Sequence, residues 1–330
     1  MKFFHLQLEE AQGGPVAEPE GGVEQWLVAH KNELLIQNRW ILSRLQRVTD
    51  SVENGLQAFE LNISTQAVYE FSWHEFCDWY IEFAKLPLRE GGGNRLQTLY
   101  TLQFVLERLM RLMHPFMPFV TEELWQTLPW VPEGAEVQHR TGGSSQKTLM
   151  LRKFPEFNKT WLHDESERVV DELREIIQSL RNFKGENNLS PKTEFDVFFR
   201  NESKSARLLI EKYCSLLGTL AKIKGFQPWV GEVREDETGP GHAVILLTRP
   251  QLELRIPLEG LVDIEGEVKR LEKEIEKFSE ELAFIRNKLS KESFVAKAPA
   301  ALVEKERTRE KELVAKTEEL AASLKRLKRK

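Results

Sequence analysis

Three arginines and one phenylalanine near the start of the chain have the chemistry of an RNA-binding surface. Arg39, Arg44 and Arg47 are interleaved with the apolar positions of one predicted helix, and Phe59 follows them. Guanidinium groups bind phosphate and an aromatic ring stacks on an unpaired base, so this combination suits a single-stranded RNA loop. A solvated helix face is the alternative. Composition alone favours that alternative, because the net charge of the chain is −5.

Basic residues gather again at the carboxyl end of the chain. Residues 262–330 hold 18 Lys and Arg against 15 Asp and Glu, so this segment is near +3 while the remainder is near −8. A rigid basic arm is suited to lying along a phosphate backbone, although charge runs on long helices are usually solvating faces. The residues that we expect to contact RNA here are Lys269, Arg270, Lys273, Lys325, Arg326, Lys328 and Arg329.

Neither a catalytic nor a metal-binding constellation is visible in the sequence. Cys77 and Cys214 are too few for a disulfide framework or a cysteine-bound zinc. His74 lies three residues before Cys77, and a core or half-buried role suits it better than a metal. A phosphate-binding glycine loop and a nucleophile elbow are missing as well. We therefore expect no catalytic residue, no metal and no cofactor in this chain.

The overall composition indicates a globular protein rich in surface helix. Of the 330 residues, 30% are charged and 41% are hydrophobic. No apolar run approaches the roughly 18 residues of a membrane-spanning helix, and the first ten residues lack the apolar core of a signal peptide. We expect a cytoplasmic protein without a membrane partner, and a monomer.

The stretch from Tyr69 to Leu88 is the predicted structural centre. On a helix, Trp73, Phe76, Tyr80 and Phe83 share one face, whereas Phe71 and Trp79 lie on others. A helix that is apolar on several sides needs surrounding helices. The sequence therefore predicts a helical bundle, in which Pro87 and the glycines at 91–93 stop the aromatic helix. The other predicted helices of this part are 23–35, 38–59, 96–113, a short helix capped by Thr121, and 164–183.

Two further modules follow the bundle. Short β-like runs at 195–199, 243–247 and 252–256 with a helix at 205–217 predict a small α+β module, and an isolated strand is predicted at 148–151. Beyond it, apolar residues from Val268 to Leu289 alternate spacings of three and four, which is a heptad seam. A second, weaker seam carries Leu313, Leu320, Leu324 and Leu327, with Glu306 and Glu310 at seam positions. The pair predicts an antiparallel coiled-coil hairpin.

Several sequence motifs together resemble one protein family. The runs NRWILSRL (38–45), YEFSWHEFCDWYIE (69–82) and RLMHPFMPFVTEELWQ (111–126) resemble the anticodon-binding bundle of class I aminoacyl-tRNA synthetases, and FCDWY is typical of the valine enzymes. The runs PLEGLVDIEGEVKRLEKEIEK (257–277) and FVAKAPAALVEKER (294–307) resemble the carboxy-terminal arm of valyl-tRNA synthetases. The resemblance covers nearly the whole chain.

The resemblance implies a mainly α fold in four parts: a connection or linker remnant at 1–22, an anticodon-binding helical bundle at 23–160, a helix with a small α+β module at 161–257, and an antiparallel coiled-coil arm at 258–330. It implies that the partner is valine tRNA. The bundle would read the anticodon, and the arm would contact the outer corner of the tRNA. Arg39, Arg44, Arg47 and Phe59 are the candidates for anticodon binding that their chemistry and position suggest.

The family's catalytic and editing domains, which use ATP and Mg, carry signatures that are missing here. The resemblance thus implies that this chain works with those upstream domains and is inactive alone. The remaining alternative is a non-catalytic helical interaction or scaffold protein, whose coiled-coil hairpin docks a protein partner.

Overall fold

The computed structural model describes residues 19–126, 136–137, 146–200, 204–229, 242–258, 261, 264–290, 309–310, 313–314 and 317. The linker predicted at 1–22 therefore lies almost entirely outside the described residues, as does the tail from Leu320 onward. The chain forms two compact units, one of residues 1–178 and 211–221 and the other of residues 179–210 and 222–330. The boundaries of the four predicted parts stay predictions.

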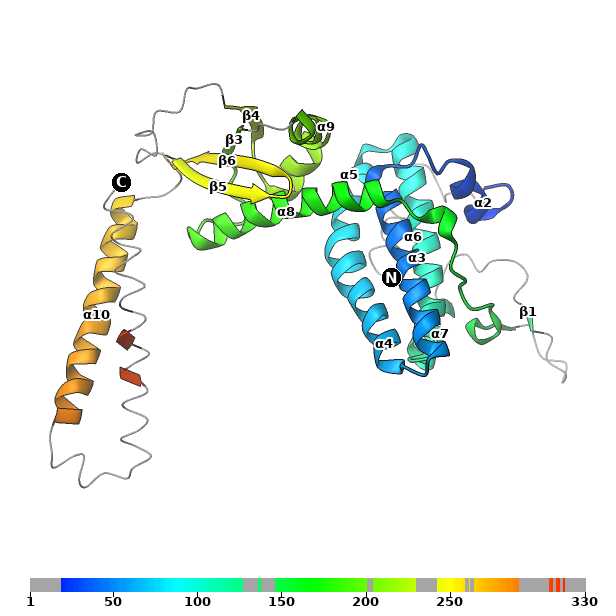
Figure 1. Ribbon diagram of the computed structural model, residues 1–330, viewed down its shortest axis with the longest axis horizontal. Helices are drawn as coiled ribbons and strands as arrows, with labels where there is room; N and C mark the ends of the chain where they lie inside the picture. Colours follow the sequence, from blue (N-terminus) through cyan, green and yellow to red (C-terminus); the bar gives the residue numbers. More distant parts are fainter. Residues whose placement is uncertain are drawn as a thin grey trace. The chain divides into compact units, whose positions relative to one another are not determined.

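The first unit is the predicted helical bundle (Figure 1). Helix α6 (Gly92–Met113) packs on both α3 (Ile36–Gln57) and α5 (Ile81–Glu90), around a core that includes Trp40, Leu45, Phe83 and Leu102, all almost fully buried. The bundle elements are α2 (Gly22–Ala29), α3 (Ile36–Gln57), α4 (Leu61–Glu70), a π-helix (Phe71–Tyr80), α5 (Ile81–Glu90), α6 (Gly92–Met113) and α7 (Pro118–Gln126).

The aromatic helix is longer than the sequence predicts. Helix α4, the π-helix and α5 follow one another without a break from Leu61 to Glu90. Pro87 lies inside α5, so the predicted stop at Pro87 is wrong. The run ends at Gly91, whose φ of 80° is in the region that favours glycine. The predicted stop at the glycines is therefore confirmed.

The π-helix changes which aromatic residues share a face. In a π-helix the backbone N–H bonds five residues back, and the N–H of Ile81 indeed donates to the carbonyl of Phe76. As a result Phe71 joins Phe76 and Tyr80 in the core, while Trp73 is 56% exposed. The predicted face, which placed Trp73 with the core residues and Phe71 elsewhere, assumed α-helical spacing and is wrong for these two residues.

A buried polar network joins three elements of the bundle. The Tyr80 hydroxyl donates to Asn38 Oδ1 at 2.9 Å, and Asn38 Nδ2 donates to Thr98 Oγ1 at 3.3 Å. Asn38 and Tyr80 are fully buried. Burial raises the pKa of Tyr80, so its hydroxyl keeps its proton and remains a donor. The network fixes the register of α3 against the π-helix and α6.

Two short elements differ from the predictions. Thr121 lies inside α7, where its hydroxyl donates to the carbonyl of Met117 at 2.8 Å, so it is not the cap of that helix. Residues Leu149–Leu151 form a 3-10 helix in place of the predicted strand, because the side chain of Thr148 accepts a hydrogen bond from the Met150 N–H and starts a turn. The neighbouring strands are β1 (Glu136–Val137) and β2 (Gln146–Lys147), which pair antiparallel.

Helix α8 (Asp164–Glu186) follows a 3-10 turn at Lys159–Trp161. The second unit contains a four-stranded sheet. The sheet has the order β4-β3-β6-β5, with β3 and β4 parallel and the other pairs antiparallel. The strands are β3 (Asp196–Arg200), β4 (Gly225–Pro228), β5 (His242–Thr248) and β6 (Gln251–Pro257), and helix α9 (Lys204–Ala221) lies between β3 and β4 in the sequence. The predicted α+β module is thus confirmed. The sequence prediction missed β4, which has the pattern GFQP with few strand-forming residues.

Helix α10 (Ile264–Ser290) carries the first predicted seam. Leu282 and Ile285 are buried against Leu313 of the return segment, with Phe278 and Leu289 packed beside them. Ion pairs flank this contact: Arg286 to Glu310 at 2.8 Å and Arg309 to Glu281 at 2.5 Å. The seam position Glu310 is therefore matched by a cation on α10. The remainder of the second seam, including Glu306, lies outside the described residues.

We predict that Tyr80→Phe destabilises the bundle by about 1–2 kcal/mol, because it leaves the buried Oδ1 of Asn38 without its donor. Urea denaturation of the chain measures this as a lower transition midpoint. Tyr69→Phe is the matched control, since Tyr69 is 55% exposed and should change stability by less than about 0.5 kcal/mol. Equal midpoints for the Tyr80 variant and the parent chain would contradict the role of the network.

Candidate nucleic-acid interface

Two of the four residues predicted to bind RNA on the bundle are paired within the fold. Arg44 binds Glu75 of the π-helix through two nitrogens, at 2.6 and 2.9 Å, and lies 3.4 Å from Glu167 of α8. Arg47 donates to both oxygens of Glu167, at 2.7 and 2.8 Å, and to Asp164 at 2.5 Å. The two arginines therefore connect α3 to its neighbours.

Both arginines of this cluster are protonated, and the carboxylates beside them offset their positive charge. The hydrogen bond to Glu75 raises the pKa of Arg44, against the opposing effect of burial. The pKa of Arg47 is likewise raised, chiefly by its hydrogen bond to Glu167. Glu167 also accepts a hydrogen bond from the Ser43 hydroxyl. The Glu167 carboxylate thus accepts hydrogen bonds from three side chains of α3. The role of Arg44 and Arg47 in RNA binding stays a prediction.

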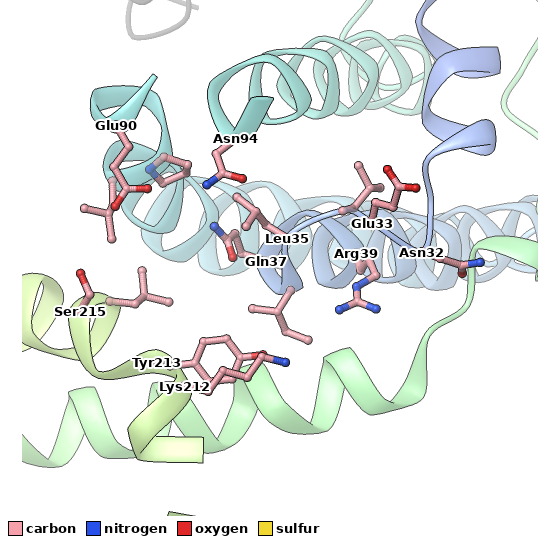
Figure 2. A pocket seen from close by; sticks show the side chains of 15 residues that line it. Asn32, Glu33, Leu35, Gln37, Arg39, Glu90, Asn94, Lys212, Tyr213 and Ser215 are labelled. Carbon is pink, nitrogen blue, oxygen red and sulfur yellow. The ribbon is translucent and has the colours of Figure 1, made fainter. Parts of the chain in front are cut away.

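Arg39 lies at the opposite end of α3 from Phe59 and lines a hollow (Figure 2). Its NH1 is 3.5 Å from His163 Nε2, and its Nε is buried without a hydrogen-bond partner. The twenty residues between Arg39 and Phe59 correspond to roughly 30 Å along a helix. These two residues therefore belong to different ends of the bundle and cannot contact one base together.

Phe59 lies in the turn between α3 and α4 and is 90% exposed. Its φ of 59° is unusual for a residue with a side chain. The turn is tight because α4 approaches α3 closely: a Cβ on Gly55 would lie 2.4 Å from the Ser64 hydroxyl, which donates to the Val52 carbonyl. The geometry presents the Phe59 ring to solvent.

Sequence reasoning missed a ridge of exposed side chains that continues from Phe59 along α4 into the π-helix. We call Phe59, Asn62, Gln66, Tyr69 and Trp73 the α4 ridge. All five are exposed. Asn62, Gln66 and Tyr69 recur at spacings of four and three, which places them on one face of α4, and Trp73 follows in the π-helix. That spacing is a detectable signal, but the sequence prediction places Trp73 on the core face. Amide side chains that hydrogen-bond base edges and rings that stack on bases are the groups that recognise single-stranded RNA.

The residues predicted on the arm are placed only in part. Lys273 is exposed on α10. Lys269 and Arg270 belong to the same helix, but their side chains lie outside the described residues, as do Lys325, Arg326, Lys328 and Arg329. Their contact with RNA stays a prediction.

Other kinds of site find no support in the described ranges. There, no group of three or more His, Cys, Asp or Glu side chains is arranged to hold a metal ion. None of the helices described is long and apolar enough to cross a bilayer. Cys77 and Cys214 are free thiols.

Comparison with known proteins agrees with this geometry. Residues 38–199 match the family described as the anticodon-binding domain of tRNA ligase, and residues 263–328 match the valyl tRNA synthetase tRNA binding arm. The valine–tRNA ligase of Geobacter sulfurreducens is 35% identical over 293 residues, which are 88% of this chain and 31% of that protein. The valine–tRNA ligase of Aquifex aeolicus is 30% identical over 289 residues, 84% of this chain and 23% of that protein.

The helical bundle and its family match define a tRNA-binding part of a tRNA ligase. The second match narrows the assignment to one kind of ligase, because its description names valyl tRNA synthetase. The chain belongs to the valyl-tRNA synthetase family, as a C-terminal region with an anticodon-binding domain and a tRNA-binding arm. It spans less than a third of the length of either relative. These matches do not favour a protein-docking scaffold.

We predict that Glu167→Ala lowers the stability of the bundle by about 1–3 kcal/mol, because it removes the shared partner of Arg44 and Arg47. The side chain of Glu167 is only 13% exposed. Asp164→Ala is the matched control: Asp164 also pairs with Arg47 but is 85% exposed, so its loss should cost less than about 1 kcal/mol. Chemical denaturation compares the two, and equal effects would argue against a structural role for Glu167.

Proposed function

We propose that this chain is the tRNA-reading part of a valine–tRNA ligase. The bundle contacts the unpaired bases of the anticodon loop, and the α10 arm contacts the outer corner of the same tRNA. The observation that carries the proposal is the α4 ridge, which lies within the residues matched to an anticodon-binding domain. Valine tRNA is the expected partner because the relatives are valine–tRNA ligases.

The ridge suits bases better than phosphates. Its groups are amides and aromatic rings, and nearby carboxylates such as Glu60 and Glu70 repel a phosphate backbone. A carboxamide can donate and accept on a base edge, and an aromatic ring stacks on any base. Gln66 Nε2 donates to Glu70 at 2.5 Å, which holds the amide against the next turn of α4. The ridge would therefore supply selectivity more than charge.

The arm supplies the complementary contribution. Its predicted contacts, from Lys269 to Arg329, are cationic, and cations that neutralise phosphates give an affinity that falls as salt rises. Arg39, Arg44 and Arg47 remain proposed contributors to anticodon binding, and Arg44 and Arg47 would act chiefly by holding α3 in place.

The parent enzyme would join valine to its tRNA with ATP and Mg in upstream catalytic and editing domains. Binding of the anticodon and the outer corner would position the acceptor end at that distant site, so binding energy gathered here would serve catalysis there. By this proposal the isolated chain does not activate valine, acts as a monomer and works in the cytoplasm.

We predict that Trp73→Ala, Tyr69→Ala and Phe59→Ala each weaken binding of valine tRNA by about 1–3 kcal/mol, the usual value of one stacked base. Gel shift at fixed salt measures the dissociation constant. Phe119→Ala is the matched control, because Phe119 is also an exposed aromatic residue, at 88%, but lies on α7, which is not part of the ridge. Ridge variants that bind like the Phe119 variant would overturn the assignment of the α4 ridge.

We predict that deleting residues 262–330 weakens tRNA binding and flattens its salt dependence while the bundle stays folded. The reason is that the deletion removes cations and leaves the ridge intact. Titrations at several salt concentrations give the slope of log affinity against log salt, and circular dichroism reports the fold. An unchanged slope would remove the arm from the tRNA contact.

A further inference from the structure

A hollow of about 420 Å³ lies at the end of the bundle where α3 begins. Its walls come from the turn before α3, the end of α5, the start of α6 and the second half of α9 (Figure 2). The volume falls in the range of roughly 300–1,000 Å³ that is typical of small-ligand sites. Leu35, Pro87 and Leu216 give the hollow an apolar wall.

Two cations face this hollow without a carboxylate partner. Among the described residues, neither Arg39 nor Lys212 forms an ion pair, and Arg39 Nε is buried with no hydrogen-bond partner. In Figure 2 the Arg39 guanidinium extends from α3 toward Lys212 on α9. The carboxylates of Glu33 and Glu90 also line the hollow, but among the described residues neither forms an ion pair with Arg39 or Lys212. The two cations are therefore available to a bound anion.

The other residues that line the hollow are suited to contact a nucleobase. Tyr213 interrupts the helical geometry of α9, with φ −113° and ψ 16°, and its ring lies in the hollow beside Lys212, whose Nζ is 5.4 Å from the ring centroid. Glu90 and Asn94 lie across the hollow from Tyr213 (Figure 2) and can accept hydrogen bonds from base amino groups. A simple inorganic anion would use only the cationic side.

We propose that this hollow binds one nucleotide, with its phosphate between Arg39 and Lys212 and its base against Tyr213. The inference rests on the proposed function only for the source of that nucleotide. The nucleotide belongs either to the RNA strand that the bundle holds or to a free nucleoside monophosphate. Both sources present the same phosphate and base.

The test uses the full chain with adenosine monophosphate and adenosine as probes, followed by calorimetry or ligand-detected NMR. We expect adenosine monophosphate to bind at least about tenfold more tightly than adenosine, because a charge-assisted phosphate contact is lost in the nucleoside. Lys212→Gln and Arg39→Gln should each lower the affinity for adenosine monophosphate by about three- to tenfold. Lys85→Gln is the matched control, since Lys85 pairs with Glu82 and does not line the hollow.

Equal binding of the two probes, or Lys212→Gln binding like the Lys85 control, would overturn the proposal. Lys212 is exposed, so that variant keeps its fold even if the Arg39 variant does not. An RNA stem-loop with the valine anticodon is then added as competitor: displacement of adenosine monophosphate assigns the hollow to an RNA nucleotide, and no displacement assigns it to a free one. Trp73→Ala should leave adenosine monophosphate binding unchanged, so loss of the α4 ridge and loss of the hollow are separable.

Discussion

The π-helix between α4 and α5 is the constraint on which both the core and the proposed interface depend. Because its backbone bonds five residues back, Phe71, Phe76 and Tyr80 can all reach the core, where Tyr80 also satisfies the buried amide of Asn38. Trp73, which α-helical spacing would place with Phe76 and Tyr80, is instead exposed, as are Tyr69 and the amide side chains of α4. One local departure from α-helical geometry thus provides a packed interior and an aromatic outer ridge on a single continuous helix.

Charge in the bundle is arranged so that most arginines of α3 are already occupied. Arg44 and Arg47 are held by Glu75 and Glu167, and breaking those pairs would leave half-buried carboxylates without partners. They are therefore poorly available to an incoming phosphate. Arg39 differs, since among the described residues it lacks a carboxylate and faces a hollow. The distinction between structural and available cations follows from which carboxylates the fold brings near, not from the arginines themselves.

That distinction also marks the limit of prediction from sequence. Helical periodicity was enough to place the bundle, the α+β module and the seam of α10, because burial of apolar residues at fixed spacing determines those elements. It failed where a backbone choice overrides the pattern: the π-helix, Pro87 inside α5, and β4 with its weak strand propensity. The pairing of Arg44 with Glu167 joins residues more than a hundred positions apart, and the convergence of Lys212 with Arg39 likewise depends on tertiary structure. No local pattern contains that information.

The neutral ridge would contribute selectivity and the cationic arm would contribute affinity, because their contacts with RNA differ physically. Stacking and amide contacts depend on which base is present and change little with salt, whereas phosphate contacts are the same for every tRNA and weaken as salt rises. Placing the two on separate modules allows nonspecific attraction by the arm without masking base discrimination by the ridge. If cations instead dominated the ridge, any RNA loop would bind there, and the acidic residues Glu60 and Glu70 beside it oppose that outcome. The acidic balance of residues 1–261, which by itself argues against RNA binding, is in this view what keeps the base contacts of the ridge selective.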